Sequence, residues 1–291
     1  MTEPEPDQPD QPDRPDPRDH YLDVPHGRLR YRDEGDGPPV VLLHAGIAQL
    51  ESWDAVADAL TSAGLRVIRP DLRGWGRSTT EDLGFSPRAD VIAVLDAAGV
   101  GRAVLVGNSM GGSLAFDTAL EYPERVVGVV GVGAGLSGYD GVDTPEELKI
   151  FAEMERLESA GPPDPDAIAE LDVSAWVDGP GQPAGRAPQW VRDAVRTWDR
   201  AINQPRHVMG RRQQLDPPAA QRLEHLGCPV FAVAGTLDFS YVVDTARHLE
   251  RNAPNARAVV WDDVAHMIGM EQPDRLADLV VAFAGQLYDE R

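Results

Sequence analysis

The sequence predicts an α/β fold, in which helices flank a mostly parallel β-sheet. Short apolar, β-branched runs alternate along the chain with segments of helical spacing, which is typical of strands joined by crossover helices. One such run, at 103–106, leads through a glycine-rich turn with Ser109 at its apex into a helical segment at 113–120. With 291 residues, of which 42% are hydrophobic, the chain can form one large domain or one domain with an insertion.

The first elements can be placed in chain order. Residues 1–19 are rich in Pro, Asp, Gln and Glu, and they are expected to be a disordered tail because they bury too little apolar surface to offset their ordering entropy. The next segments predict a hairpin at 21–32, a buried strand at 40–43, a helix at 51–63, a strand at 66–69, a glycine-punctuated loop at 70–78 and a helix at 87–98.

The second half of the chain contains a change of composition. After a strand at 125–130, residues 135–226 hold helical patches between Gly/Pro-rich turns and no strand-like run. We therefore expect a core made of residues 20–134 and 227–291, with a helical cap inserted at 135–226. The sheet resumes with a strand at 229–235, a helix at 242–251, a strand at 256–261 and a final helix at 273–287.

Charge and composition restrict the partners. The net charge of −21, from 48 acidic and 27 basic residues, argues against nucleic acid, because a phosphate backbone would be repelled. No apolar stretch is long enough to span a membrane, and the acidic, Pro-rich N-terminus does not resemble a signal peptide, so we expect a cytoplasmic protein. The single cysteine, Cys228, excludes an intrachain disulfide. The oligomeric state is not predicted.

Ser109 is the candidate nucleophile. Gly107 and Gly111 flank it without Cβ atoms, so neighbouring backbone can pass close to a serine held in a strained turn. The turn opens a helix, and the backbone N–H of Met110 therefore points toward an anion that forms beside the serine.

A serine hydroxyl needs a base that accepts its proton, and the base needs a carboxylate that orients it. His266 is the candidate base, because it lies between the last strand and the last helix, at the sheet edge where catalytic groups collect. Asp238 directly follows the strand at 229–235 and is the candidate acid. Asp262 and Asp263 are alternatives that lie close to His266 in the sequence.

The oxyanion formed by serine attack needs two hydrogen-bond donors. We expect the Met110 N–H to be one of them. The other is expected in the turn after the strand at 40–43, where Gly46 is favoured and Ile47 is the alternative. His44, in the same turn, is expected to hold nearby backbone in place.

Together these residues resemble the α/β-hydrolase fold superfamily over about residues 21–287. The resemblance is carried by the sequences HAG at 44–46, DLRGWGRS at 71–78, GNSMGG at 107–112 and GTLD at 235–238, and by the late His266. It looks closest to the 3-oxoadipate enol-lactonase-like serine hydrolases and is also similar to serine C–C hydrolases of aromatic degradation. It implies an eight-stranded sheet whose second strand is antiparallel, with a cap after strand six. Ala45 departs from the glycine usual at that position.

The resemblance and the three candidate residues predict hydrolysis of a small carboxylic ester or lactone through an acyl-enzyme, without a metal or organic cofactor. A serine at position 109 argues against haloalkane dehalogenases and epoxide hydrolases, which use aspartate there. The alternatives are C–C bond hydrolysis, a cofactor-free perhydrolase and a ligand receptor with a slow triad. A C–C substrate would need a cation for its carboxylate, for which the candidates are Arg77, Arg186, Arg192, Arg211 and Arg212. The cap tryptophans Trp176, Trp190 and Trp198 could line a pocket or anchor the cap helices.

Overall fold

The structure, a computed structural model, describes residues 16–159 and 161–289. Its strands are β1 (His20–Val24), β2 (Gly27–Glu34), β3 (Pro39–Leu43), β4 (Arg66–Pro70), β5 (Thr79–Thr80), β6 (Gly84–Phe85), β7 (Ala103–Asn108), β8 (Val126–Val132), β9 (Arg211–Arg212), β10 (Val230–Gly235) and β11 (Ala256–Trp261). Its α-helices are α1 (Asp54–Ser62), α2 (Pro87–Ala97), α3 (Met110–Glu121), α4 (Pro145–Ser159), α5 (Pro165–Asp172), α6 (Gln189–Ile202), α7 (Ser240–Asn252), α8 (Ile268–Glu271) and α9 (Pro273–Asp289).

The central sheet has the expected topology. Eight strands follow the order β1-β2-β4-β3-β7-β8-β10-β11, and the short β5 pairs with β2 at the side. Strand β2 runs antiparallel to both of its neighbours on this path, whereas all pairs from β4 to β11 are parallel. The predicted mostly parallel sheet with an antiparallel second strand is therefore confirmed.

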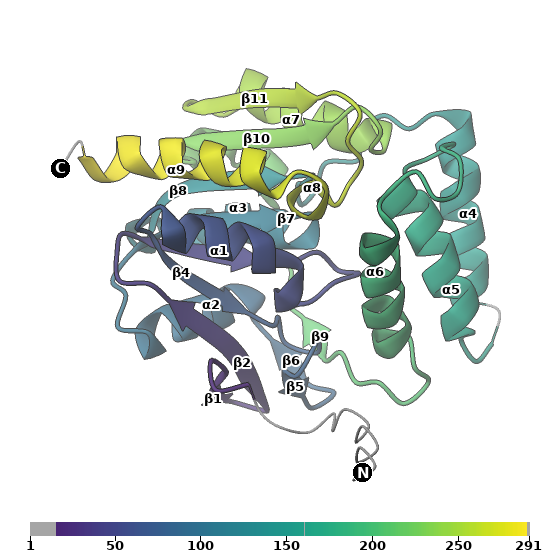
Figure 1. The fold of residues 1–291 in the computed structure, drawn as a ribbon, viewed down its shortest axis with the longest axis horizontal. Helices are drawn as coiled ribbons and strands as arrows, with labels where there is room; N and C mark the ends of the chain where they lie inside the picture. Colours follow the sequence, from purple (N-terminus) through teal and green to yellow (C-terminus); the bar gives the residue numbers. More distant parts are fainter. Residues whose placement is uncertain (1–15, 160, 290–291) are drawn as a thin grey trace, which may run out of the picture.

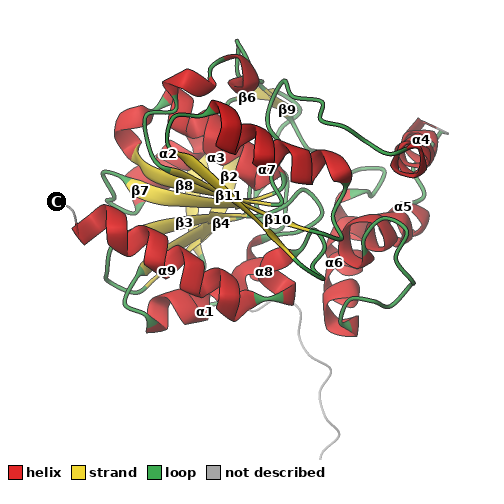
Figure 2. Ribbon diagram, turned by 90° about the horizontal axis from the view of Figure 1, so that it is seen from above, coloured by secondary structure: helices red, strands yellow, loops and turns green. Residues whose placement is uncertain are grey.

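Helices cover both faces of this sheet (Figure 2). Helices α2, α3 and α7 lie on one face, while α1, α8 and α9 lie on the other. Successive side chains of a strand point to opposite faces, so Val41 and Leu43 of β3 enter the first core and Val40 and Leu42 enter the second. Burial on both faces explains why β3 reads as one continuous apolar run.

The segment between β8 and β10 contains α4, α5, a π-helical turn at Val173–Asp178 and α6. Figure 1 shows α4, α5 and α6 together at the end of the sheet toward which β10 and β11 point. This arrangement agrees with a helical cap, although the boundaries at residues 135 and 226 stay a prediction. The expectation that this segment holds no strand is wrong, because β9 pairs in parallel with β6. Two residues are too few for an alternating pattern to be detected.

Part of the segment predicted as a disordered tail is ordered. Residues 1–15 lie outside the described residues, but residues 16–19 are described, and the buried side chain of Asp19 binds Arg30 and Arg32 of β2, at 2.8 and 2.9 Å. Asp16 also contacts Arg32, at 2.9 Å. Composition alone suggests that these carboxylates are solvated, because Arg30 and Arg32 lie more than ten residues away in the sequence.

None of the helices within residues 16–159 and 161–289 combines the length and the apolarity that crossing a bilayer requires. The cytoplasmic location, and the expected lack of nucleic-acid and membrane partners, stay predictions from the sequence.

Candidate active site

Ser109 occupies a strained turn between β7 and α3. Its φ of 56° and ψ of −117° are rare for a residue with a side chain. Hydrogen bonds fix the turn on both sides: the Ser109 N–H donates to the Val132 carbonyl at 2.9 Å, and the Ser109 carbonyl accepts from the N–H groups of Gly112 and Ser113. The surrounding fold therefore holds the serine in this conformation.

Glycines make the turn possible. A Cβ placed on Gly107 would lie 2.1 Å from the Gly111 oxygen, and one on Gly111 would lie 2.2 Å from the Leu43 oxygen. Both distances are far inside van der Waals contact, so a side chain at position 107 would push the start of α3 away from β7, and one at position 111 would push it away from β3. The close backbone approach expected from the sequence is present.

The structure brings Asp238 and His266 together. Asp238 lies after β10 and His266 lies after β11, and the Asp238 Oδ2 is 2.8 Å from the His266 Nδ1. Both side chains are buried. The other carboxylate oxygen of Asp238 accepts the Phe239 N–H at 2.8 Å. Because the Asp238 carboxylate accepts a hydrogen bond from Nδ1–H, Nε2 is the ring nitrogen free to act as a base.

The two alternative acids lie elsewhere. Asp262 and Asp263 are exposed, and within the described residues neither is hydrogen-bonded to His266. The Asp263 N–H donates to the Thr236 hydroxyl at 3.0 Å. The geometry thus favours Asp238 over the residues that are closer in sequence.

Asn108 joins the serine turn to the histidine loop. Its buried side-chain amide donates to the carbonyls of Val132, at 2.9 Å, and His266, at 3.2 Å. The described residues show no hydrogen bond between the Ser109 hydroxyl and His266 itself, which is common in sites without substrate. The sequence motifs did not indicate this role of Asn108. Its position directly before the serine was the available signal.

The candidate oxyanion donors lie on neighbouring segments. The Met110 N–H opens α3 and has no acceptor among the described residues. Gly46 and Ile47 occupy the middle of a turn that the Ala48 N–H closes on the Ala45 oxygen, at 3.1 Å. A Cβ on Gly46 would lie 3.9 Å from the Met110 sulfur, so this turn borders the serine turn. Gly46 and Ile47 both stay candidates for the second donor.

His44 has the supporting position that the sequence suggested. Its Nε2 accepts the Leu72 N–H at 2.9 Å, which places the proton on Nδ1, and Nδ1 donates to the Ala45 oxygen at 2.7 Å. Burial lowers the pKa of His44 to about 4. The neutral ring therefore holds together the two loops on either side of it.

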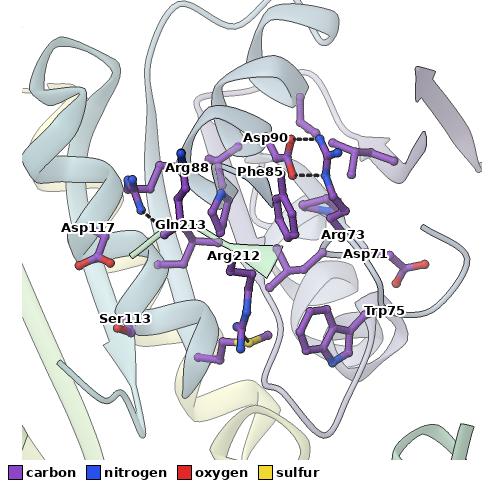
Figure 3. Close-up of a pocket in the computed structure, with 18 of the residues that line it drawn as sticks. Asp71, Arg73, Trp75, Phe85, Arg88, Asp90, Ser113, Asp117, Arg212 and Gln213 are labelled. Carbon is purple, nitrogen blue, oxygen red and sulfur yellow. Dashed lines mark hydrogen bonds and ion pairs between the residues drawn. The ribbon is translucent and has the colours of Figure 1, made fainter. Parts of the chain in front are cut away.

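A cavity of about 170 Å³ lies beside the start of α3 (Figure 3). Met110, Ser113 and Leu114 of α3 line it, together with side chains of β2, β6 and α2. Figure 3 shows Ser113 and Asp117 on one side, Trp75 on the other and Arg212 between them. Asp117 accepts the Ser137 hydroxyl at 2.7 Å, and burial raises its pKa. The cavity begins next to a candidate oxyanion donor.

The five arginines considered as carboxylate ligands differ in their partners. Four of them contact carboxylates of the protein: Arg77 with Asp19 at 3.4 Å, Arg186 with Glu271 at 2.6 Å, Arg192 with Asp178 at 3.2 Å and Arg211 with Asp82 at 3.6 Å. Arg212 lines the cavity, and it has no carboxylate partner among the described residues.

Trp176 contacts the candidate base, a role that the sequence did not indicate. The indole packs on the His266 ring with centroids 4.6 Å apart and on the Phe239 ring at 4.3 Å. Trp190 is instead 55% exposed. The two tryptophans differ although both lie in the segment predicted as a cap, because Trp176 lies on the π-helical turn that packs against the loops after β10 and β11, whereas Trp190 lies at the start of α6.

A family model described as "Alpha/beta hydrolase family" matches residues 40–279, most of the chain. The chain belongs to the alpha/beta hydrolase family. This alpha/beta hydrolase is 32% identical over 282 residues to a 2-hydroxy-6-oxononadienedioate/2-hydroxy-6-oxononatrienedioate hydrolase of Burkholderia vietnamiensis. The aligned region covers 88% of this chain and 90% of that protein.

Solved structures agree with this assignment. The alpha/beta hydrolase resembles the esterase RhEst1 from Rhodococcus sp. ECU1013 with a TM-score of 0.74 and 27% identity, over 93% of this chain and 99% of the esterase. It also shares its fold with the enol-lactonase from Burkholderia xenovorans LB400, with a TM-score of 0.71 and 22% identity, over 91% of this chain and 99% of the lactonase. The resemblance drawn from the sequence motifs is confirmed.

Proposed function

We propose that this hydrolase cleaves a small carboxylic ester or lactone through an acyl-enzyme, with Ser109 as nucleophile, His266 as base and Asp238 as the acid that orients it. The observation that carries the proposal is the buried hydrogen bond of 2.8 Å between Asp238 and His266, on loops tied by Asn108 to the serine turn.

In this mechanism Nε2 of His266 takes the Ser109 proton as the oxygen attacks the substrate carbonyl. The Met110 N–H and a second N–H, from Gly46 or Ile47, stabilise the oxyanion. His266 then returns the proton to the leaving alcohol. Water, deprotonated by the same ring, releases the acid from Ser109. Asp238 stabilises the charged imidazole in both halves of the reaction.

The proposal is tested with Ser109→Ala and a panel of short esters and lactones. Loss of the nucleophile should lower kcat at least about 1000-fold, with an unchanged circular dichroism spectrum. Ser62→Ala, which changes an exposed serine at the end of α1, is the matched control and should retain full activity. A serine-directed phosphonate should label Ser109 in the unmodified enzyme. Unchanged turnover in Ser109→Ala would reject the assignment.

C–C bond hydrolysis is the second candidate, because the Burkholderia vietnamiensis relative is named as a hydrolase of 2-hydroxy-6-oxononadienedioate. The same three residues could serve that reaction. Turnover of a dienoic keto acid, without turnover of any ester or lactone in the panel, would favour it over ester hydrolysis.

A further inference from the structure

Three arginines line the cavity beside Met110, and two of them are paired with carboxylates of the protein. Arg73 donates to both oxygens of Asp90, at 2.8 and 2.5 Å, and to the Pro25 carbonyl. Arg88 pairs with Glu121 and donates to the Gln213 carbonyl at 2.9 Å. Figure 3 shows the Arg73–Asp90 pair and the contact between Arg88 and Gln213.

Arg212 differs from both. A guanidinium carries five N–H donors, yet the polar contact of Arg212 within the described residues is the Met110 sulfur, a weak acceptor. Its guanidinium carbon also lies 5.2 Å from the centre of the Trp75 ring. Arg212 is an exposed residue of β9, and partial desolvation of its guanidinium beside the cavity lowers its pKa, but an arginine stays charged at neutral pH. A cation whose donors are open to solvent or to a ligand therefore faces the cavity.

The backbone fixes the direction of this side chain. The Arg211 N–H donates to the Leu83 carbonyl at 2.9 Å, and the Gln213 N–H donates to the Phe85 carbonyl at 2.8 Å. Successive side chains of a strand point to opposite sides. Arg211 accordingly pairs with the exposed Asp82, whereas Arg212 lines the cavity.

The acidic groups of the cavity do not neutralise Arg212. Asp71 pairs with Arg30 at 3.1 Å, and Asp90 pairs with Arg73. Asp117 accepts a hydrogen bond from the Ser137 hydroxyl, and its pKa is raised because burial disfavours the charged carboxylate. The position beside Arg212 is therefore open to an anion supplied by a ligand.

We propose that Arg212 binds a carboxylate group of the substrate, so that the enzyme prefers half-esters of short dicarboxylic acids over neutral esters of the same length. The proposal rests on the proposed ester hydrolysis. The contact of Arg212 with the Met110 side chain places the carboxylate next to the residue whose N–H is a candidate oxyanion donor. A planar carboxylate can accept two parallel hydrogen bonds from a guanidinium group.

The test compares monoethyl glutarate with ethyl pentanoate, in which a methyl group replaces the carboxylate, by titrating the acid released. The unmodified enzyme should prefer the half-ester in kcat/KM. Arg212→Gln should lower the ratio of the two kcat/KM values about 10- to 100-fold, the effect of losing a charge-assisted hydrogen bond. Arg212→Lys should retain part of the preference. Arg211→Gln, next to it on β9, is the matched control and should leave the ratio unchanged.

A ratio that Arg212→Gln does not change would overturn the proposal while leaving ester hydrolysis intact. If no ester or lactone of the panel is cleaved, including these two, the proposed function fails, and binding decides the question about Arg212 separately. Calorimetric titration of monoethyl glutarate into Ser109→Ala should then show binding that Ser109→Ala/Arg212→Gln has lost. Equal binding by both variants would also reject the carboxylate site.

Discussion

The indole ring of Trp176 lies against the imidazole ring of His266, and the Trp176 carbonyl accepts the backbone N–H of His266 at 3.3 Å. Trp176 belongs to the π-helical turn that leads to Gly179, where a Cβ would lie 2.4 Å from the Leu237 oxygen. The same turn thus contacts the loops of both His266 and Asp238. We therefore expect Trp176 to be a positioning residue that holds the candidate base against its acid.

Trp176→Ala should lower kcat about tenfold or more while changing KM less, because a loosened imidazole is misplaced for proton transfer. His266 is only 2% exposed, so it should resist diethyl pyrocarbonate in the unmodified enzyme and become reactive in the variant. Peptide mapping by mass spectrometry measures this exposure. Trp176→Phe, which keeps an aromatic ring at this position, should retain both the kcat and the protection of His266. Trp190→Ala removes an exposed tryptophan and should change neither. Continued protection of His266 in Trp176→Ala would contradict the positioning role.

Asp238→Asn should lower kcat by roughly 10⁴-fold without unfolding the protein, because an amide cannot stabilise the charged imidazole and favours the wrong tautomer. Ester hydrolysis and circular dichroism measure the two effects. Asp262→Asn, at an exposed position, should behave as the unmodified enzyme. Comparable losses in the two variants would mean that the acid has been misassigned.

Ser109→Gly should be inactive but more stable than the unmodified enzyme. Glycine adopts a φ of 56° without the strain that a side chain causes, and relief of roughly 1 kcal/mol would raise Tm by about 2–4 °C. Ser109→Ala is the matched control, since it also removes the hydroxyl but keeps the Cβ. Equal melting temperatures for the two variants would show that the turn stores no such strain.

His44 should make the fold sensitive to acid. Its pKa is about 4 in the folded chain and 6.5 in the unfolded chain, so between these values the unfolded state binds more protons and stability falls as pH falls. Between pH 7 and pH 5 this loss amounts to about 2 kcal/mol. Urea unfolding of His44→Gln, which does not titrate, should show a pH dependence smaller by that amount.

Asp71 also contributes to the pH dependence of stability, with a sign opposite to that of His44. Burial raises its pKa to about 6, so Asp71 favours the folded state at low pH and loses that contribution as pH rises. Asp71 is present in both proteins, and the difference between them therefore reports on His44. Identical pH profiles would show that His44 is not the group responsible.

The sequence predicted the sheet well, because strands such as β3 and β7 are buried on both faces and contain unbroken apolar runs. Asp238 and His266 were identifiable as candidates because they lie in the loops that follow β10 and β11. The pairing of β9 with β6 was not predictable, since each strand is two residues long and the partners are more than 100 residues apart.

The roles of Trp176 and Arg212 were not predictable for the same reason, because they depend on contacts between segments that are distant in the sequence. Trp176 contacts His266 through the packing of one segment on another, and neither residue has a local pattern that indicates the other. Arg212 could be proposed only as one of five arginines. The other four arginines contact carboxylates of the protein, whereas Arg212 does not within the described residues. These contacts are visible only in the folded structure.

The ion pairs of Asp16 and Asp19 set a limit on how far the chain can be trimmed for crystallisation. A shortened protein that starts at His20 would keep every strand of the sheet but lose both of these carboxylates. Arg30 and Arg32, whose side chains are 1% and 4% exposed, would then be left with fewer counter-charges, at a cost on the order of 3 kcal/mol. N-terminal deletions should therefore remove no residue beyond position 15.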